Sequence, residues 1–388
     1  MAAYVKNLIP RSLDKIRAIA IHLPQYHTIP ENDQWWGKGF TEWTNVKKAK
    51  PLFDGHIQPH VPLNNNYYDL NDNKALCDQA KMAKEYGIHG FCFYHYWFNG
   101  KKLLEKPLEQ MLEQGTPDFP FMLCWANENW TRTWDGMDKH VLMKQDYGFE
   151  DDEAHFDYLL PFFKDDRYIK IDGKPVFLVY RTELFPDINK TAEIWRQKAK
   201  ENGLPGIYLI RVEGWVQNVN PESIGFDAAM YFQPNAAKNF FNAKYKEPIL
   251  EKIPRLVKKY ILRRPNSENP YAYKIPNVLI SYKKYVSNFK RIHTKVKYKQ
   301  FPSVFPGWDN SPRKQKNAYI FNENTPEIYE DWLRYMVAKF KPYSDDENLV
   351  FINAWNEWGE GNHLEPCEKW GYSYLEETKK ALKNDADN

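Results

Sequence analysis

The chain has 388 residues and a formal net charge of +3, and this length is enough for one large domain or two medium ones. A net charge this small says nothing by itself about a partner. No run of about 18 apolar residues occurs, which excludes a predicted membrane-spanning helix. Aromatic residues make up 16% of the chain. This share favours a cleft that binds rings, and the alternative is an ordinary core in a tyrosine-rich chain.

The N-terminal segment and the cysteines bear on the location of the protein. The first 15 residues, MAAYVKNLIPRSLDK, lack the long apolar region of a signal peptide. No two cysteines form a C-x-x-C pair, and two lie in strand-like runs, so we interpret them as reduced core thiols. A cytoplasmic location is therefore predicted. The cysteines are Cys77, Cys92, Cys124 and Cys367.

Short apolar runs alternate with helical patterns along the chain. The predicted strands are 17–23, 88–97, 119–125, 174–180, 206–212, 227–232, 301–305 and 349–354. The predicted helices are 72–86, 103–114, 151–163, 190–202, 326–340 and 374–382. Repeated strand–helix units imply parallel pairing, and eight units predict one α/β domain over 1–388, a (β/α)8 TIM-like barrel with long loops. A doubly wound open sheet is the alternative, but no nucleotide-binding glycine motif follows the first strand.

Polar and aromatic residues follow every predicted strand, where the active sites of barrels lie. Caps and turns explain one or two such clusters, but explain eight poorly. In chain order the residues are Gln25 and His27; His95, Tyr96 and Trp97; Asn127, Glu128 and Asn129; Arg181 and Glu183; Glu213 and Trp215; Gln233; Trp308, Asp309 and Asn310; and Asn356, Glu357 and Glu360.

Residues 238–300 interrupt the barrel pattern and carry 17 lysines and arginines against three acids. Apolar residues at helical spacing over 249–261 predict a basic amphipathic helix. We therefore predict a basic, largely helical insertion between strands six and seven. It could contact an anionic membrane surface or a lipid-linked sugar, or it could be a helix packed on the barrel. No nucleic-acid-binding motif is visible, so no nucleic-acid partner is expected.

Glu357 and Glu360 are the candidate catalytic pair. Glycosidases use two carboxyl groups that face one pocket, and three residues just past a strand can place both there. An E-x-x-E spacing is also common on solvated helix surfaces. Here the two glutamates stand among Trp355, Trp358 and two glycines, which favours the active site.

Five motifs carry a family resemblance. They are PQYH (24–27), WGKGFTEWTN (36–45), YHYW (94–97), WANENWT (125–131) and NAWNEWGE (353–360). Together they resemble the WbsX-like family, whose members are associated with bacterial O-antigen and capsule gene clusters and are often labelled glycosyltransferases. That family in turn resembles glycoside hydrolase family 99, the endo-α-mannosidases, mainly in fold and in an E-W-x-E motif similar to EWGE (357–360).

The more distant resemblance implies a retaining mechanism through a 1,2-anhydro sugar. Glu357 would be the base on the 2-hydroxyl of the sugar, and Glu360 would protonate the leaving oxygen and later deprotonate the incoming nucleophile. Indoles near Glu360 could desolvate its carboxyl group and keep it protonated. Water as the nucleophile makes the enzyme a hydrolase, and a sugar hydroxyl makes it a transferase.

The remaining candidates have binding or structural roles. Glu128 is expected to orient a sugar or to pair with Arg132; Glu42 could close the pocket or only fix its loop, and Glu365 is expected to be structural. No metal-binding spacing such as H-E-x-x-H occurs, so we expect no metal and no cofactor. The predicted substrate-binding residues are His27, Trp43, His95, Tyr96, Trp97, Asn127, Glu128, Trp130, Trp308, Asn356 and Trp358.

Three functions fit these features. The first is a retaining carbohydrate-active enzyme of bacterial surface polysaccharide metabolism that cleaves or transfers α-glycosidic linkages. The second is a glycosyltransferase that builds O-antigen or capsule on a lipid-linked acceptor, although no nucleotide-binding motif is present and no metal-holding D-x-D triplet is identified at a predicted strand end. The third is a non-catalytic glycan-binding protein, which the presence of both Glu357 and Glu360 disfavours.

Overall fold

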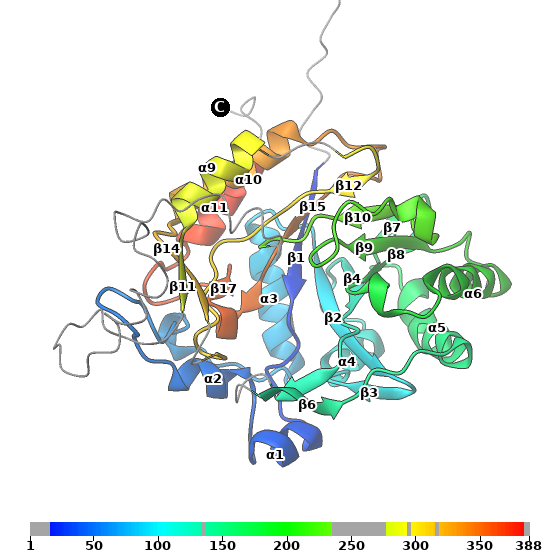
Figure 1. Cartoon of the computed structure of the whole chain (residues 1–388), viewed down its shortest axis with the longest axis horizontal. Coiled ribbons are helices and arrows are strands. Elements are labelled where there is room, and N and C mark those ends of the chain that lie inside the picture. The colour runs from blue at the N-terminus through cyan, green and yellow to red at the C-terminus, as the bar shows by residue number, and fades with distance from the viewer. Residues whose placement is uncertain (1–15, 133–136, 235–276, 293–295, 315–317, 384–388) are drawn as a thin grey trace, which may run out of the picture.

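A parallel β-sheet curls into a barrel at the centre of the computed structural model, which describes residues 16–132, 137–234, 277–292, 296–314 and 318–383 (Figure 1). The strand order is β12-β10-β9-β8-β4-β2-β1-β15-β13. These strands are β1 (Arg17–His22), β2 (Gly90–Phe98), β4 (Phe121–Trp125), β8 (Lys174–Val179), β9 (Tyr208–Val212), β10 (Ala228–Met230), β12 (Gln300–Phe301), β13 (Ser303–Val304) and β15 (Leu349–Ile352).

One interrupted strand closes the barrel. β12 pairs with β10 and β13 pairs with β15, and only Pro302 separates the two short strands. Proline has no N–H for a strand ladder, which accounts for the break. The Pro302 carbonyl still accepts a 2.9 Å hydrogen bond from the backbone N–H of Phe351. β12 and β13 together take the place of the seventh strand, so the predicted eight-stranded barrel is confirmed.

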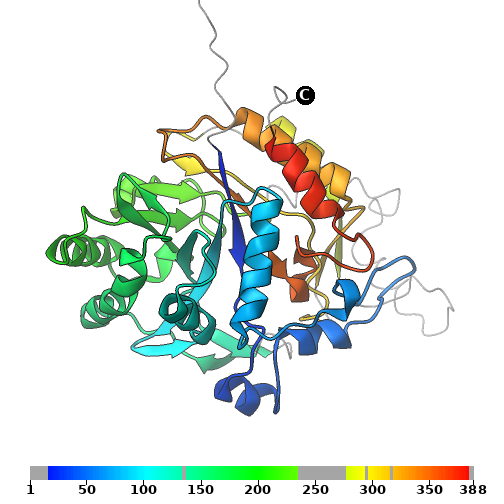
Figure 2. The ribbon, with the colours of Figure 1, turned by 180° about the vertical axis from the view of Figure 1, so that it is seen from behind.

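Helices cover the outside of the barrel. In the reverse view, α3 runs along the outer side of β1 and β2 (Figure 2). α3 begins where the Asp72 side chain accepts the N–H of Lys74, and it buries Leu76, Ala80 and Ala83 at helical spacing. The helices are α3 (Asn73–Glu85), α4 (Lys106–Gln114), α5 (Phe149–Lys164), α6 (Ile188–Glu201), α9 (Tyr282–Ile292), α10 (Pro326–Lys339) and α11 (Ser373–Leu382).

The predicted insertion is only partly within the described residues. Its last part forms β11 (Val278–Ser281), which pairs with β14 (Tyr319–Asn322), and then α9. α9 buries Tyr282 and Phe289, and the Phe289 ring lies 5.3 Å from that of Trp332 on α10. This end of the stretch therefore packs on the barrel between strands six and seven, and the bounds 238–300 of the insertion stay a prediction. The predicted helix over 249–261 lies outside the described residues.

The longest additions to the barrel follow the C-terminal ends of its strands. β1 points toward α1 and α2, which lie together at one end of the barrel (Figure 1). None of the helices in the described ranges is long and apolar enough to cross a membrane. The additions and short elements are α1 (Pro30–Trp36), α2 (Glu42–Lys48), β3 (Lys101–Leu103), β5 (Trp130–Arg132), β6 (Met137–Met143), β7 (Lys170–Ile171), β16 (Asn356–Glu357), β17 (Asn362–His363) and the 3-10 turns η2 (Leu63–Asn65), η4 (Thr182–Leu184), η5 (Pro221–Ile224) and η7 (Trp358–Glu360).

Candidate active site

Three carboxylates meet one guanidinium at the C-terminal end of the barrel. Arg313 contacts Glu42 through Nε at 2.7 Å, Glu357 through one terminal nitrogen at 2.7 Å, and Glu360 through the other at 2.8 Å. Glu357 ends β16 and Glu360 ends η7, so the 3-10 turn brings both side chains to the same cation. The planar fork of arginine can hold several carboxylates at once, whereas a lysine presents a single point charge. The structure thus brings the two predicted catalytic glutamates together.

Arg313 is a residue of the site that was not predicted from the sequence. It lies in the loop after β13, and its side chain is only 14% exposed. Glu42, on α2, is fully buried, so it belongs to the cluster and does not merely fix its loop. Three largely buried carboxylates require a cation, and this requirement was the only sequence signal for an arginine.

Burial changes the pKa of two of these carboxyl groups. Burial raises the pKa of Glu360 to about 8; the charge of Arg313 opposes this rise, and the charge of Glu357 adds to it. Burial also raises the pKa of Glu42, again against the effect of Arg313. Glu360 is therefore predominantly protonated at neutral pH, which is the state that a general acid needs.

Gly359 allows the cluster to form. A Cβ atom at this position would lie 1.6 Å from Oε1 of Glu42, the oxygen that Arg313 contacts. We expect Gly359→Ala to displace Glu42, to lower the free energy of unfolding by about 2 kcal/mol through overpacking, and to reduce turnover sharply. Urea unfolding and activity assays measure both effects. Gly148→Ala is the matched control, because a Cβ atom at Gly148 would meet no other atom within 4 Å; equal behaviour of the two variants would contradict the prediction.

Three buried tyrosines lie within electrostatic range of the cluster. The buried side chains of Tyr94 and Tyr96 on β2 interact electrostatically with Glu357, and burial raises the pKa of both phenols. Tyr180, just after β8, interacts in the same way with Glu360. The hydroxyl groups of phenols can donate hydrogen bonds to sugar oxygens. Of these three tyrosines, only Tyr96 was among the predicted binding residues.

Strand alternation separates His95 and Trp97 from the cluster. β2 continues to Phe98, so successive side chains point to opposite faces and only Tyr94 and Tyr96 face the carboxylates. His95 instead contacts His155 of α5 at 2.8 Å, and the Trp97 indole donates to Asp151 at 2.9 Å. His95 and Trp97, which were predicted to bind substrate, thus pack against a barrel helix and lie on the face away from the carboxylates.

Asn356 and Trp358 lie beside the catalytic pair but already have internal partners. The Asn356 amide exchanges hydrogen bonds with both backbone groups of Leu23 and donates to Tyr68. Trp358 is 1% exposed, and its indole donates to Glu365 at 2.6 Å. Both side chains therefore support the loop and do not offer free groups to a sugar.

Glu365 is the centre of a second buried network. Its carboxylate accepts hydrogen bonds from Gln79, Tyr68, Trp355 and Trp358. Burial raises the pKa of Glu365 to about 7. The four donors tie the loop of the catalytic pair to α3 and to the segment before it, which agrees with the structural role expected for Glu365.

Trp43 forms part of the wall behind the cluster. Its ring lies 4.6 Å from Tyr26 and 5.5 Å from Trp358, and its indole donates to the Tyr68 carbonyl. Trp43 is only 5% exposed. It supports Glu42, its neighbour on α2, and does not present a free ring face to the cluster.

Trp130 and Trp215 lie at the rim. The ring of Trp130 packs 5.2 Å from Tyr96, so it is one ring away from Glu357. Trp215 is 54% exposed, and the Arg181 guanidinium lies 4.9 Å from its ring centre. Trp215 follows β9 but was not among the predicted binding residues. An indole face at such a position can stack on a sugar ring.

The remaining predicted binding residues contact parts of the fold other than the carboxylate cluster. The Asn127 amide bonds the backbone of Arg181, and Glu128 forms an ion pair with the Arg181 side chain. His27 is buried, bonds the carbonyl of Pro24, and has no contact to the carboxylates. Trp308 lines a separate cavity, described below. Within the described ranges, no group of three His, Cys, Asp or Glu side chains could hold a metal ion.

A family model for the glycosyltransferase WbsX matches residues 18–378. The chain belongs to this WbsX family. Protein WxcX from Xanthomonas campestris pv. campestris, described as uncharacterized, is 38% identical over 381 residues in strain B100 and in strain ATCC 33913. That match covers 98% of this chain and 51% of the relative, so the chain spans about half the length of the curated relatives it matches.

Solved structures share the fold of this WbsX-family chain. The endo-α-mannosidase of glycoside hydrolase family 99 from Bacteroides thetaiotaomicron aligns with a TM-score of 0.55 at 13% identity, covering 94% of this chain and 96% of that one. A glycoside hydrolase-like protein aligns with a TM-score of 0.57, also at 13% identity, over 95% and 94%. At this identity the likeness shows a shared barrel fold.

Proposed function

We propose that this WbsX-family enzyme cleaves or transfers α-glycosidic linkages with retention of configuration, using Glu357 and Glu360. The observation that carries the proposal is that one arginine holds both carboxylates while burial keeps Glu360 protonated. Two neighbouring carboxyl groups, one of which is held protonated, are the usual arrangement for acid–base work on a glycosidic bond. The surrounding phenols and indoles support a sugar as the substrate.

The first half-reaction uses both glutamates at once. Glu357 removes the proton of the 2-hydroxyl of the sugar, and O2 forms a bond to C1. As the bond from C1 to the leaving oxygen breaks, Glu360 gives that oxygen its proton. The products are a 1,2-anhydro sugar, a protonated Glu357 and an ionised Glu360. Arg313 stabilises the carboxylate charge in both states because it contacts both side chains.

The second half-reaction reverses these roles. The ionised Glu360 takes a proton from the incoming hydroxyl, whose oxygen bonds to C1 while the C1–O2 bond breaks. O2 then regains its proton from Glu357. Two displacements at C1 restore the original configuration. Water in this step gives hydrolysis, and a sugar hydroxyl gives transfer.

Transfer is the alternative function, and the description of the matching family as a glycosyltransferase favours it. In that case the enzyme would build O-antigen or capsule on a lipid-linked acceptor. A contact of residues 238–300 with a membrane surface or a lipid-linked sugar, and a cytoplasmic location, stay predictions. Incubating the enzyme with α-linked oligosaccharides, with and without an added sugar acceptor, separates the two reactions. Reducing ends that increase without an acceptor indicate hydrolysis, and a larger product formed only with an acceptor indicates transfer.

The pH dependence of the reaction tests the role of Glu360. A general acid must be protonated, and the pKa of Glu360 is about 8. We expect kcat/KM to be maintained up to neutral pH and to fall as the pH rises through about 8, because the acid form is then lost. A pH–rate profile at constant ionic strength measures this alkaline limb. Activity that instead rises through pH 8 would contradict the assignment of Glu360 as the acid.

A further inference from the structure

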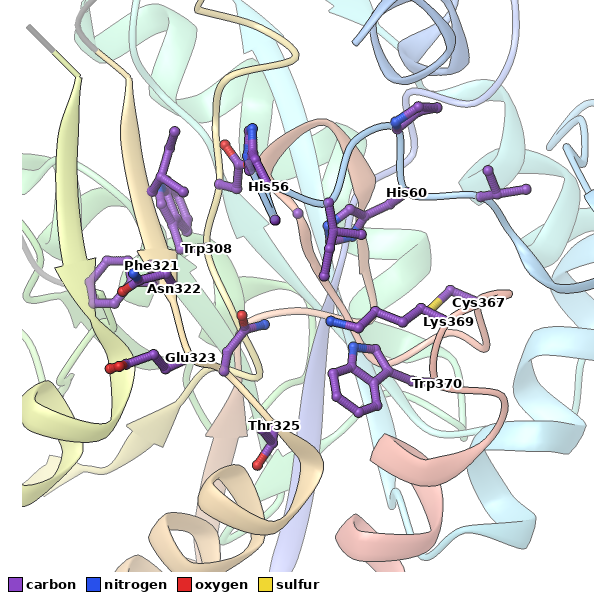
Figure 3. A pocket seen from close by; sticks show the side chains of 18 of the residues that line it. His56, His60, Trp308, Phe321, Asn322, Glu323, Thr325, Cys367, Lys369 and Trp370 are labelled. Atoms are coloured by element: carbon purple, nitrogen blue, oxygen red, sulfur yellow. The ribbon is translucent and has the colours of Figure 1, made fainter. Parts of the chain in front are cut away.

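A cavity of about 390 Å³ lies beside the loop that carries the catalytic pair (Figure 3). Gly361, directly after Glu360, lines it, whereas the side chains of the carboxylate cluster do not. The backbone N–H of Asp309, another lining residue, bonds the carbonyl of Glu360. The cavity is therefore separate from the proposed active site but shares a wall with it, and its volume is in the range of small-ligand sites.

The cavity is lined mainly by aromatic and apolar groups from three segments. Figure 3 shows Trp308 on one side, Trp370 on the opposite side, and the loop of His56 and His60 across one end. Trp308 and Trp370 are both partly exposed. Indole faces that are open to a cavity are suited to stacking on the C–H faces of a pyranose ring.

The three acidic side chains that line the cavity already accept hydrogen bonds from other residues. Asp309 already accepts hydrogen bonds from His56 at 2.7 Å and Gln58 at 2.6 Å. Glu323 bonds the hydroxyl of Ser281, and Figure 3 shows its carboxylate pointing away from Lys369. The third acid, Glu368, accepts the backbone N–H of Asn64 at 2.7 Å. The acids of the lining thus have other partners.

Lys369 is the available cation. Its ammonium lies 4.1 Å from the ring centre of Trp370, and Figure 3 shows it reaching into the cavity. No carboxylate pairs with it in the part of the chain that the structure describes. Burial lowers the pKa of His60, so this imidazole is neutral and adds no positive charge. An ammonium group without a carboxylate partner can pair with the carboxylate of a ligand.

Asn322 adds an unused acceptor. Its Oδ1 atom is shielded from solvent and has no hydrogen-bond partner among the described residues. A buried amide oxygen without a partner costs about 1–3 kcal/mol, and a ligand hydroxyl can remove that cost. Asn322 lines the cavity next to Phe321, across from Lys369 (Figure 3).

We propose that this cavity binds an acidic sugar, a pyranose that bears a carboxylate, as a non-catalytic subsite. The ring lies against Trp308 or Trp370, the carboxylate pairs with the ammonium of Lys369, and a hydroxyl donates to Asn322. The inference rests on the proposed function in taking a glycan as the ligand. It predicts that the polysaccharide this enzyme handles contains acidic residues.

Binding of two matched glycosides tests the proposal. Methyl β-D-glucuronide and methyl β-D-glucoside differ only in the carboxylate, and isothermal titration gives the Kd of each. The protein is the full chain with Glu360→Gln, so that turnover does not interfere. We expect the glucuronide to bind about tenfold more tightly, which corresponds to about 1.4 kcal/mol. Lys369→Met should remove this preference, and Trp370→Ala should weaken both glycosides.

Lys190→Met is the matched control, because Lys190 is an exposed lysine on α6 that pairs with Glu193. It should keep the full preference for the glucuronide. Equal Kd values for the two glycosides, a preference that survives Lys369→Met, or no detectable binding of either would overturn the proposal. These outcomes do not depend on catalysis, so they are distinguishable from a failure of the proposed two-glutamate reaction.

Discussion

Replacing Glu360 with glutamine is expected to lower kcat by about 10²–10⁴-fold, the usual contribution of a general acid–base group. Glutamine has the same shape, and its amide oxygen can still accept a hydrogen bond from Arg313. It has no proton to give to the leaving oxygen and no charge with which to activate the incoming hydroxyl. The Kd of an oligosaccharide substrate, measured by titration calorimetry, should therefore change little while turnover is lost.

Glu109→Gln is the matched control for this substitution. Glu109 is a partly exposed glutamate on α4, one of the helices outside the barrel, and it pairs with Lys102 at 2.6 Å. It should retain the native kcat. Full activity in Glu360→Gln would remove Glu360 from the mechanism, whatever the behaviour of Glu357.

The second large effect is expected at Arg313. Replacing it with glutamine leaves Glu42, Glu357 and Glu360 together without a cation. Removing one partner from a buried ion pair costs about 3–5 kcal/mol, so we expect a loss of this order in the free energy of unfolding. Because the charge of Arg313 lowers the pKa of Glu360, its loss should also move the alkaline limb of the pH–rate profile to higher pH. Urea unfolding and the pH profile measure the two effects.

Arg313→Lys keeps the positive charge but lacks the planar guanidinium group that contacts several carboxylates at once. It contacts fewer of the three carboxylates, so we expect it to be more stable than Arg313→Gln and less active than the native enzyme. This variant keeps the test informative if Arg313→Gln does not fold. An Arg313→Lys enzyme with native turnover would show that the three contacts of the guanidinium are not needed for the reaction.

The barrel could be predicted because each strand is an apolar run followed by polar residues. The pairing of Glu357 and Glu360 was predicted by the same reasoning. The two glutamates are three residues apart just after a strand, and a tight turn there can place both side chains on one side. Arg313 could not be predicted in this way. It is a single residue in a long loop, and it meets Glu42 and Glu357 across sequence separations of 271 and 44 residues.

The placement of His95 and Trp97 has a specific physical cause. The predicted strand 88–97 already contained both residues, but it did not show on which face of the strand each side chain lies. Alternation along β2 assigns Tyr94 and Tyr96 to the face of the cluster and their neighbours to α5. All residues of β2 are buried, so no alternation of polar and apolar residues marks the two faces in the sequence. Similarly, the sequence does not show that the Trp358 indole N–H is bonded to Glu365.

The anomeric configuration of the first product tests the central claim most directly. ¹H NMR spectra recorded during the first turnovers of an α-linked oligosaccharide, or of a transfer reaction, distinguish the α from the β anomer before mutarotation. The two-glutamate reaction through a 1,2-anhydro sugar predicts that the first product is the α anomer. A β anomer as the first product would contradict the mechanism and the roles of Glu357 and Glu360 in it.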